Sequence, residues 1–173
     1  LARNFVPSMV PMIATRGEFL TSYTPYQPEV SQGMLQAMWE FQTMVSELVE
    51  LPISNVSMYD ASTSAAEAIT CAVRVKSKKV EKPNTVFISE LVPPHRLSVI
   101  ENYTQGVGIE IMKLPHGSDG LLDLEMASSA SGSCAVYVEQ PNSFGILDEG
   151  LMRLREIVGE KTAIIVGVDV TTL

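Results

Sequence analysis

The longest helical pattern in the chain begins at Ser31. Its apolar positions recur at spacings of three and four residues, namely at Met34, Leu35, Met38, Phe41, Val45 and Leu48. This spacing predicts one amphipathic helix, which ends before Pro52. Closer to the N-terminus, Pro7 and the apolar positions up to Ile13 predict a shorter helix, because proline is favoured in a first helical turn.

From residue 60 onward, helical stretches alternate with short apolar runs. Helices are predicted at 60–73, 94–105, 123–129 and 149–158, with Gly106 ending the second of them. Strands are predicted at 85–89, 109–114, 134–139 and 162–169, and residues 56–59 are a further strand candidate. Strands that alternate with helices predict an α/β fold, in which a mostly parallel sheet carries right-handed crossovers and helices on both faces.

A tyrosine-rich segment at 21–29 precedes the long helix. Its two prolines disfavour helical geometry at Thr24 and Gln27, so the segment is predicted to run extended or to turn. Tyr23 and Tyr26 cannot serve as packing residues of an amphipathic element there, and two phenols are costly to bury without partners. Two interpretations remain open: the segment is a rigid connector that covers a core, or it lines a binding pocket.

Length, charge and cysteine content narrow the class of protein. The chain has 173 residues and a net charge of -8, which suffices for one compact domain and argues against nucleic-acid or anionic-membrane surfaces. No apolar run approaches the roughly 20 residues that span a bilayer. Cys71 and Cys134 make no disulfide framework and, with two histidines, a poor zinc site, so a cytoplasmic setting fits best.

Charged residues make up only 18% of the chain, against about 25% in an ordinary domain, so part of the surface is expected to be covered by a partner. The chain begins at Leu1 without an initiator methionine and stops at Leu173, just after an apolar run typical of a central strand. We therefore expect it to be part of a longer protein.

Ligands of open α/β sheets bind beyond the carboxyl ends of the strands, which directs attention to four segments. Near Asp60, the hydroxyls of Ser62 and Thr63 begin a helix and are either a phosphate cradle or an ordinary N-cap. His95 could contact a ligand or simply face solvent. Asp169 could pair with a cationic ring nitrogen or cap a turn, and the segment 139–144 offers no assigned chemistry.

Several catalytic classes lack their motifs. There is no Gly-x-Ser-x-Gly, Gly-x-Gly-x-x-Gly or Walker sequence, and neither cysteine has a catalytic signature. The six lysines are Lys76, Lys78, Lys79, Lys82, Lys113 and Lys161, and none has the pattern of a buried amine that would form a Schiff base. The residues alone therefore predict an α/β domain with a tyrosine-rich loop and a partner, and no reaction.

Four longer segments carry a resemblance to a known family. Phe19-Leu-Thr-Ser-Tyr-Thr-Pro-Tyr-Gln-Pro-Glu-Val-Ser-Gln-Gly33, followed by Phe41-Gln-Thr-Met-Val-Ser-Glu-Leu48 and Asn55-Val-Ser-Met-Tyr-Asp60, resembles subunit 1 of glycine dehydrogenase (decarboxylating), the P-protein of the glycine cleavage system. The sequence Glu139-Gln-Pro-Asn-Ser-Phe-Gly145 is similar to a second signature of that family.

This resemblance implies the large domain of a fold type I pyridoxal-phosphate enzyme, similar to aspartate aminotransferase. It implies an N-terminal helix and tyrosine-rich loop at 1–30 and an incomplete large domain at 31–173. It also implies a cytoplasmic heterotetramer with glycine dehydrogenase subunit 2, an oxidoreductase of glycine catabolism. In that assembly pyridoxal phosphate is expected on the partner subunit, and the lipoyl group of H-protein accepts the aminomethyl group of glycine.

The resemblance implies that this chain lines part of a shared active site and forms a subunit interface, and that it has no catalytic residue of its own. Substrate-pocket residues are expected at Tyr23, Thr24, Tyr26, Gln27 and Glu29, and the helix from Ser31 is the expected subunit contact. Two rivals remain: a self-sufficient pyridoxal-phosphate enzyme with its lysine beyond Leu173, and a non-catalytic scaffold for subunit 2.

The sequence departs from the family pattern at two positions. Pro93-Pro94 stands where the family has a His-Pro pair, so the position of the ring-stacking histidine is proline and His95 is offset from it. Ala61 stands where glycine is expected in the phosphate loop. Both departures argue against a cofactor role for this chain.

Overall fold

The computed structural model describes residues 5–21 and 23–172, which form two units, one up to Ser57 and one from Met58. The expectation of a longer protein was based on the chain ends, Leu1 and Leu173, and both residues lie outside the described part of the structure. Ser22 of the tyrosine-rich segment lies outside it as well. The length alone suggested one compact domain, whereas the chain divides after residue 57. The division by role into 1–30 and 31–173 stays a prediction.

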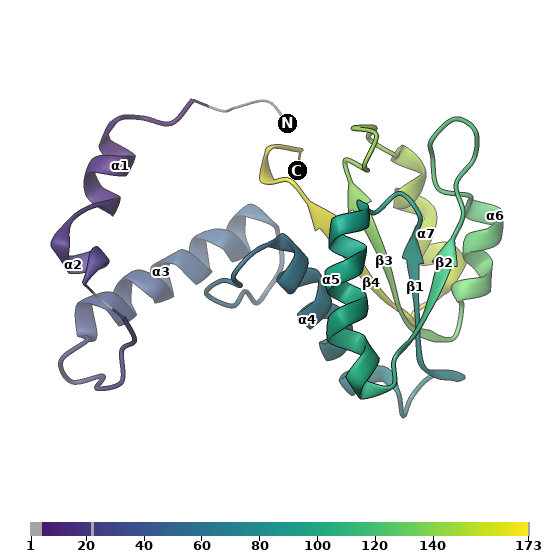
Figure 1. Ribbon diagram of the computed structural model, residues 1–173, viewed down its shortest axis with the longest axis horizontal. Helices are drawn as coiled ribbons and strands as arrows, with labels where there is room; N and C mark the ends of the chain where they lie inside the picture. The colour runs from purple at the N-terminus through teal and green to yellow at the C-terminus, as the bar shows by residue number, and fades with distance from the viewer. Residues whose placement is uncertain (1–4, 22, 173) are drawn as a thin grey trace. The chain divides into compact units, whose positions relative to one another are not determined.

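The N-terminal unit consists of helices and loops in its described part (Figure 1). Its helices are α1 (Met9–Ala14), α2 (Gly17–Leu20) and α3 (Gln32–Leu48). The predicted long helix is thus confirmed as α3, whereas α2 was not anticipated because Gly17 is a weak helix former. Tyr23 to Gln27 form no regular element, as the two prolines predict.

The second unit alternates helices and strands. Its helices are α4 (Ala61–Lys76), α5 (Pro94–Thr104), α6 (Leu124–Ala127) and α7 (Leu154–Val158). Its strands are β1 (Lys82–Ser89), β2 (Glu110–Leu114), β3 (Ser133–Gln140) and β4 (Ala163–Val168). Short 3-10 turns follow α5 and α6 and precede α7, at Gln105–Val107, Ser128–Ala130 and Glu149–Arg153, and Val170–Thr172 follows β4.

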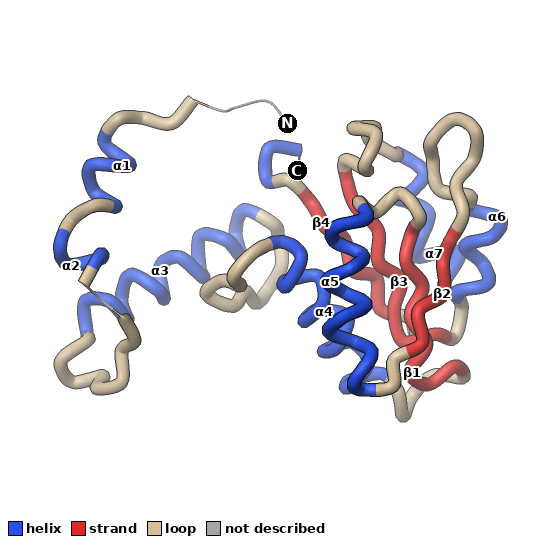
Figure 2. Tube along the Cα trace, in the orientation of Figure 1, coloured by secondary structure: helices blue, strands red, loops and turns tan. Residues whose placement is uncertain are grey.

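The four strands form one parallel sheet in the order β2-β1-β3-β4 (Figure 2). The predicted fold class is confirmed. The chain crosses from β1 to β2 on one side and later returns to place β3 on the other side of β1. The strand order therefore reverses between β1 and β3, and this is the point of an open α/β sheet at which ligands bind beyond the carboxyl ends of the strands.

Helices cover both faces of this sheet, α4 and α5 on one face and α6 and α7 on the other (Figure 1), and each face carries an apolar core. On one face α4 and α5 pack through Ile69 and Ile100, both fully buried, against Ile88. On the other face Leu154 of α7 packs near Phe87. Because alternate residues of a strand point to opposite faces, the continuous apolar run of β1 supplies both cores.

Two local predictions were wrong. Residues 56–59 form no strand, because the sheet takes its strands from 82–168 and this segment pairs with none of them. Gly106 does not end its helix: a 3-10 turn continues through Gln105–Val107, and Gly108, with φ of 68°, adopts the left-handed conformation that ends it.

Candidate functional site

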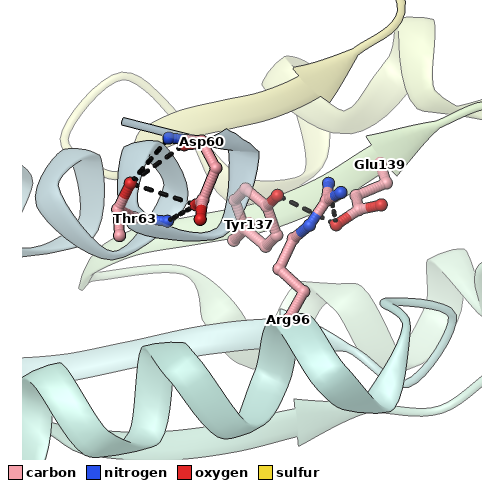
Figure 3. A network of polar contacts seen from close by, with 5 residues as sticks. All are labelled: Asp60, Thr63, Arg96, Tyr137 and Glu139. Carbon is pink, nitrogen blue, oxygen red and sulfur yellow. Dashed lines mark hydrogen bonds and ion pairs between the residues drawn. The ribbon is translucent and has the colours of Figure 1, made fainter. Parts of the chain in front are cut away.

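A partly buried ion pair lies at the reversal point of the sheet. Arg96, in the first turn of α5, donates from Nη1 to Oε1 of Glu139 on β3 over 2.8 Å, and the hydroxyl of Tyr137 donates to the same oxygen over 3.0 Å (Figure 3). The side chains of Arg96 and Glu139 are 19% and 7% exposed. The three groups join α5 to the carboxyl end of β3.

Burial and charge set the protonation states of this cluster. Burial, followed by the negative charge of Glu139, raises the pKa of Tyr137, so the phenol keeps its proton and acts as a donor. Burial lowers the pKa of Arg96, but its contacts with Tyr137 and Glu139 outweigh that effect and the pKa is raised. Nε of Arg96 is the one buried side-chain nitrogen or oxygen in the described part of the chain without a hydrogen-bond partner.

Gly167 on β4 makes room for this cluster. A Cβ atom at this position would lie 2.6 Å from the Tyr137 hydroxyl oxygen and 3.2 Å from Cγ of Glu139. These separations are too short for a methyl group, so any larger residue must displace the phenol or the carboxylate. Glycine at 167 therefore lets the cluster fill the crevice between α5 and the sheet.

The N-terminus of α4 is capped by its own side chains. Oδ1 of Asp60 accepts from Thr63 N over 2.7 Å, and Asp60 N donates to Thr63 Oγ1 over 3.1 Å, which is a complete capping box (Figure 3). The Thr63 backbone bond lowers the pKa of Asp60. A phosphate here would meet a carboxylate that already holds the helix N–H groups, so the arrangement fits an N-cap and does not fit a phosphate cradle.

Asp169 and His95, the other residues of this unit predicted as possible ligand contacts, form local hydrogen bonds or face solvent. The Asp169 carboxylate accepts from the Thr171 hydroxyl over 2.7 Å and from Thr171 N over 2.9 Å, and these bonds lower its pKa. It therefore caps the turn after β4, one of its two predicted roles. His95 is exposed. The cofactor roles predicted for Ser62, Thr63 and Asp169 gain no support from this geometry.

The tyrosine-rich segment belongs to the other unit and presents its side chains outward. Tyr23 and Tyr26 are 93% and 80% exposed, and Thr24, Gln27 and Glu29 are exposed as well. Local backbone bonds shape the segment, with Tyr26 N donating to Thr24 O over 2.9 Å. The five predicted pocket residues thus lie on one segment and are all exposed.

Comparison with known proteins agrees with this combination of sheet and loop. Residues 2–173 match the family model described as the glycine cleavage system P-protein. The chain belongs to the P-protein family. It is 43% and 45% identical over 172 residues to relatives from Thermococcus kodakarensis and Thermococcus onnurineus, each named probable glycine dehydrogenase (decarboxylating) subunit 1. Those matches cover 98% of this chain and 37% of each relative.

Solved structures give the same family and the wider fold. A crystal structure of glycine decarboxylase (P-protein) in an inhibitor-bound form is 38% identical, with a TM-score of 0.80, over 95% of this chain and 36% of that one. A NifS-like protein matches with a TM-score of 0.65 at 14% identity, which reflects the fold alone. The predicted family resemblance is therefore confirmed.

The second P-protein signature, residues 139–145, begins with the last two residues of β3 and continues as a braced loop. Asn142 is 6% exposed; its Nδ2 donates to Gly120 O over 2.8 Å, and its Oδ1 accepts from Phe144 N over 3.0 Å. Leu91 O accepts from Ser143 N over 3.0 Å, which ties the loop to the end of β1. In this chain the signature builds the rim of the sheet.

The six lysines of this P-protein chain all lie within the described residues. Lys82 Nζ donates to Ser129 O, Lys161 lies 3.8 Å from Glu81, and Lys113 is exposed on the edge strand β2. The others are in or just after the C-terminal turn of α4. Lys113 lines a cavity of about 270 Å³ with Ser89 and Glu90, which end and follow β1, respectively. None of the six lysines makes a hydrogen bond or ion pair with the cluster of Arg96, Tyr137 and Glu139.

Sequence reasoning missed the buried cluster of Arg96, Tyr137 and Glu139. One signal was available, because Tyr137 and Glu139 are two residues apart in an otherwise apolar strand and must share a face. Arg96, their partner, could not be predicted in the same way, since it lies 43 residues before Glu139 and contacts it only because β3 lies beside β1 in the sheet.

Among the described residues, no cluster of three metal-ligating side chains occurs, and no helix is long and apolar enough to cross a membrane.

Proposed function

We propose that this chain is one of two subunits of a glycine-decarboxylating P-protein. Together with a second subunit it would decarboxylate glycine and transfer the aminomethyl group to the lipoyl arm of H-protein. The observation that carries this proposal is the match of 98% of the chain to relatives named glycine dehydrogenase (decarboxylating) subunit 1. The chain spans about 37% of the length of those relatives, so the reaction belongs to the complete assembly.

Pyridoxal phosphate is proposed to be held by the second subunit. When bound there, it supplies the electron sink that decarboxylation of an amino acid requires. Three features of this chain support that placement: the Asp60 cap at the N-terminus of α4, the ion pair in the crevice, and six lysines that make no hydrogen bond or ion pair with it. The crevice of this chain is then a structural element filled by its own side chains.

The tyrosine-rich segment is proposed as this chain's contribution to the active site. The phenols of Tyr23 and Tyr26, with the polar side chains of Thr24, Gln27 and Glu29, would line the pocket of the partner that receives glycine and the lipoyl arm. Exposed, fully hydrogen-bond-capable groups on a proline-restricted segment can hold a substrate in a reactive orientation at low entropic cost.

Reconstitution tests the proposed reaction. The full-length protein is combined with its second subunit and H-protein, and exchange of labelled bicarbonate into glycine is measured. Exchange that requires all three components supports the proposal. If the full-length protein without the second subunit gave the same exchange rate as the three components together, a self-sufficient enzyme would be favoured instead. If the second subunit and H-protein gave that rate without this chain, the chain would have at most a structural role.

Tyr23→Phe and Tyr26→Phe test the role of the segment. Each keeps the ring and removes the hydroxyl, so a pocket role predicts an exchange rate at least about tenfold lower with assembly intact, since a positioned group contributes that much or more. Tyr59→Phe, at another exposed tyrosine, is the matched control. Wild-type exchange by both variants would exclude a hydroxyl-mediated role.

Borohydride reduction locates the cofactor. Reduction of the active complex followed by peptide mapping is expected to give a phosphopyridoxyl lysine in the second subunit. The same adduct on Lys113, or on any other lysine of this chain, would contradict the proposed division of labour.

A further inference from the structure

A cavity of about 270 Å³ lies where β1 and β2 end. Three of the residues that line it come from three elements: Ser89 ends β1, Lys113 lies one residue before the end of β2, and Pro94 begins α5. Ligands of open α/β sheets bind beyond the carboxyl ends of the strands. The volume is near the lower end of ligand cavities, roughly 300 Å³, and suits a molecule the size of an amino acid.

The apolar walls of the cavity belong to the core of the sheet unit. Ile88 and Val92 are 1% and 4% exposed, and Leu97 of α5 is half-buried. A hydrogen bond from Val92 N to Ser89 O, 3.1 Å long, fixes the turn that follows β1. Because the walls are packed and the turn is hydrogen-bonded, the cavity is preformed, and a ligand that enters it orders little of the protein.

Two opposite charges line the same cavity without pairing. Lys113 is the register partner of Ile88 in the parallel sheet, so the two side chains lie on the face that α4 and α5 cover. Glu90 directly follows β1. Within the described part of the chain, neither the Lys113 amine nor the Glu90 carboxylate makes a hydrogen bond or an ion pair, with each other or with another residue. Both charges are therefore available to a ligand.

The lining restricts the chemical class of that ligand. Glu90 repels a simple anion, and Lys113 repels a simple cation. A sugar needs several hydrogen-bonding groups, whereas Ser89 is the one neutral polar side chain among the residues that line the cavity. A small molecule with a carboxylate, an ammonium group and an aliphatic part complements the two charges and the apolar walls together.

We propose that this cavity binds a free aliphatic α-amino acid of about the size of leucine. Lys113 binds its carboxylate, Glu90 binds its ammonium group, and the aliphatic side chain packs against Ile88, Val92 and Leu97. The 11-residue helix α5 begins at the cavity without a side-chain cap, and the positive end of its dipole favours the carboxylate further. The site uses neither the ion-pair cluster nor the tyrosine-rich segment, so this inference does not depend on the proposed function.

Equilibrium dialysis of the full-length protein against labelled L-leucine tests whether the site exists. We expect saturable binding with a dissociation constant of about 1 mM or tighter. Glycine should bind at least about tenfold more weakly, because it has no side chain to bury. Without saturable binding of leucine, as when another part of the full-length protein fills the cavity, the proposal would be overturned. Equal affinity for glycine and leucine would overturn the assigned ligand class.

Lys113→Met and Glu90→Gln test the two charged contacts. Each should weaken leucine binding at least about tenfold, since a hydrogen bond between charged groups contributes that much. Lys161→Met and Glu101→Gln remove exposed charges outside the cavity and are the matched controls, expected to change binding less than about twofold. Circular dichroism checks that all four variants keep the wild-type fold. Equal effects of the cavity and control substitutions would contradict the assignment.

Two leucine analogues show which residue holds which group. 4-Methylpentanoate lacks the ammonium group and 3-methylbutylamine lacks the carboxylate, so wild-type protein should bind each at least about tenfold more weakly than leucine. In Glu90→Gln the preference over 4-methylpentanoate should fall below about twofold, and in Lys113→Met the same should hold for 3-methylbutylamine. Unchanged preferences in both variants would place leucine elsewhere and overturn the proposal.

Discussion

The two units of the chain use apolar residues in opposite ways. Residues 58–172 bury theirs on both faces of a four-stranded sheet, with Ile69, Ile88 and Val136 at 0%, 1% and 0% exposure. The described residues of the N-terminal unit bury none, and Trp39 stays 70% exposed. Hydrophobic periodicity is equally clear in both, so periodicity predicts that a helix forms but not which molecule covers it.

Core truncation in each unit gives the largest expected contrast. Ile69→Ala removes a fully buried side chain and should lower the free energy of unfolding by about 2–5 kcal/mol. Phe41→Ala, at a side chain 43% exposed, should change it by less than about 0.5 kcal/mol in the isolated chain. Urea unfolding followed by circular dichroism measures both, and equal losses would remove the distinction between the units.

Substitutions in the Arg96–Glu139 ion pair test how much it stabilises the sheet unit at the carboxyl ends of the strands. Glu139→Gln leaves the guanidinium of Arg96 without a counter-charge and should cost about 3 kcal/mol, the lower end for buried pairs, because Arg96 keeps some exposure. Adding Arg96→Met removes the orphaned charge and should restore most of the loss. A double variant less stable than Glu139→Gln would show that Arg96 stabilises the fold by itself.

Gly167 supplies a steric test of the same cluster. Gly167→Ala places a methyl group against the Tyr137 hydroxyl and should cost about 1–3 kcal/mol in unfolding free energy. Gly106→Ala is the matched control, because nothing lies within 4 Å of a Cβ at that position. Thermal denaturation compares the two, and a neutral Gly167→Ala would mean that the cluster shifts freely.

The smallest expected effect is a pH dependence at the α4 cap. Since the folded-state pKa of Asp60 lies below its ordinary value of 3.8, the cap stabilises the fold above that value. This contribution is lost as the pH falls below about 4 and through the folded-state pKa. Asp60→Asn should remove it, so the variant's stability should fall less steeply with acid, as urea unfolding between pH 5 and 2.5 would detect.

Sequence patterns predicted the sheet because each strand and helix is specified locally. The apolar runs at β1 and β3 and the apolar positions of α4 and α5, such as Ile69 and Ile100, suffice to predict the type of each element and the order of elements along the chain. Residues 56–59 misled because a short apolar run becomes a strand only if a neighbouring strand accepts it. The Arg96–Glu139 pair escaped prediction because it depends on the order of strands, which no local pattern carries.

Hydrogen exchange of the full-length protein, alone and with its second subunit, tests the central claim most directly. Amides of β1 and β3 should be protected in both states, whereas those of α3 should exchange rapidly alone and become at least about 100-fold slower in the complex, since burial against a partner adds its free energy to local stability. Strong protection of α3 without the second subunit, unchanged on its addition, would contradict the expectation that α3 is a subunit contact.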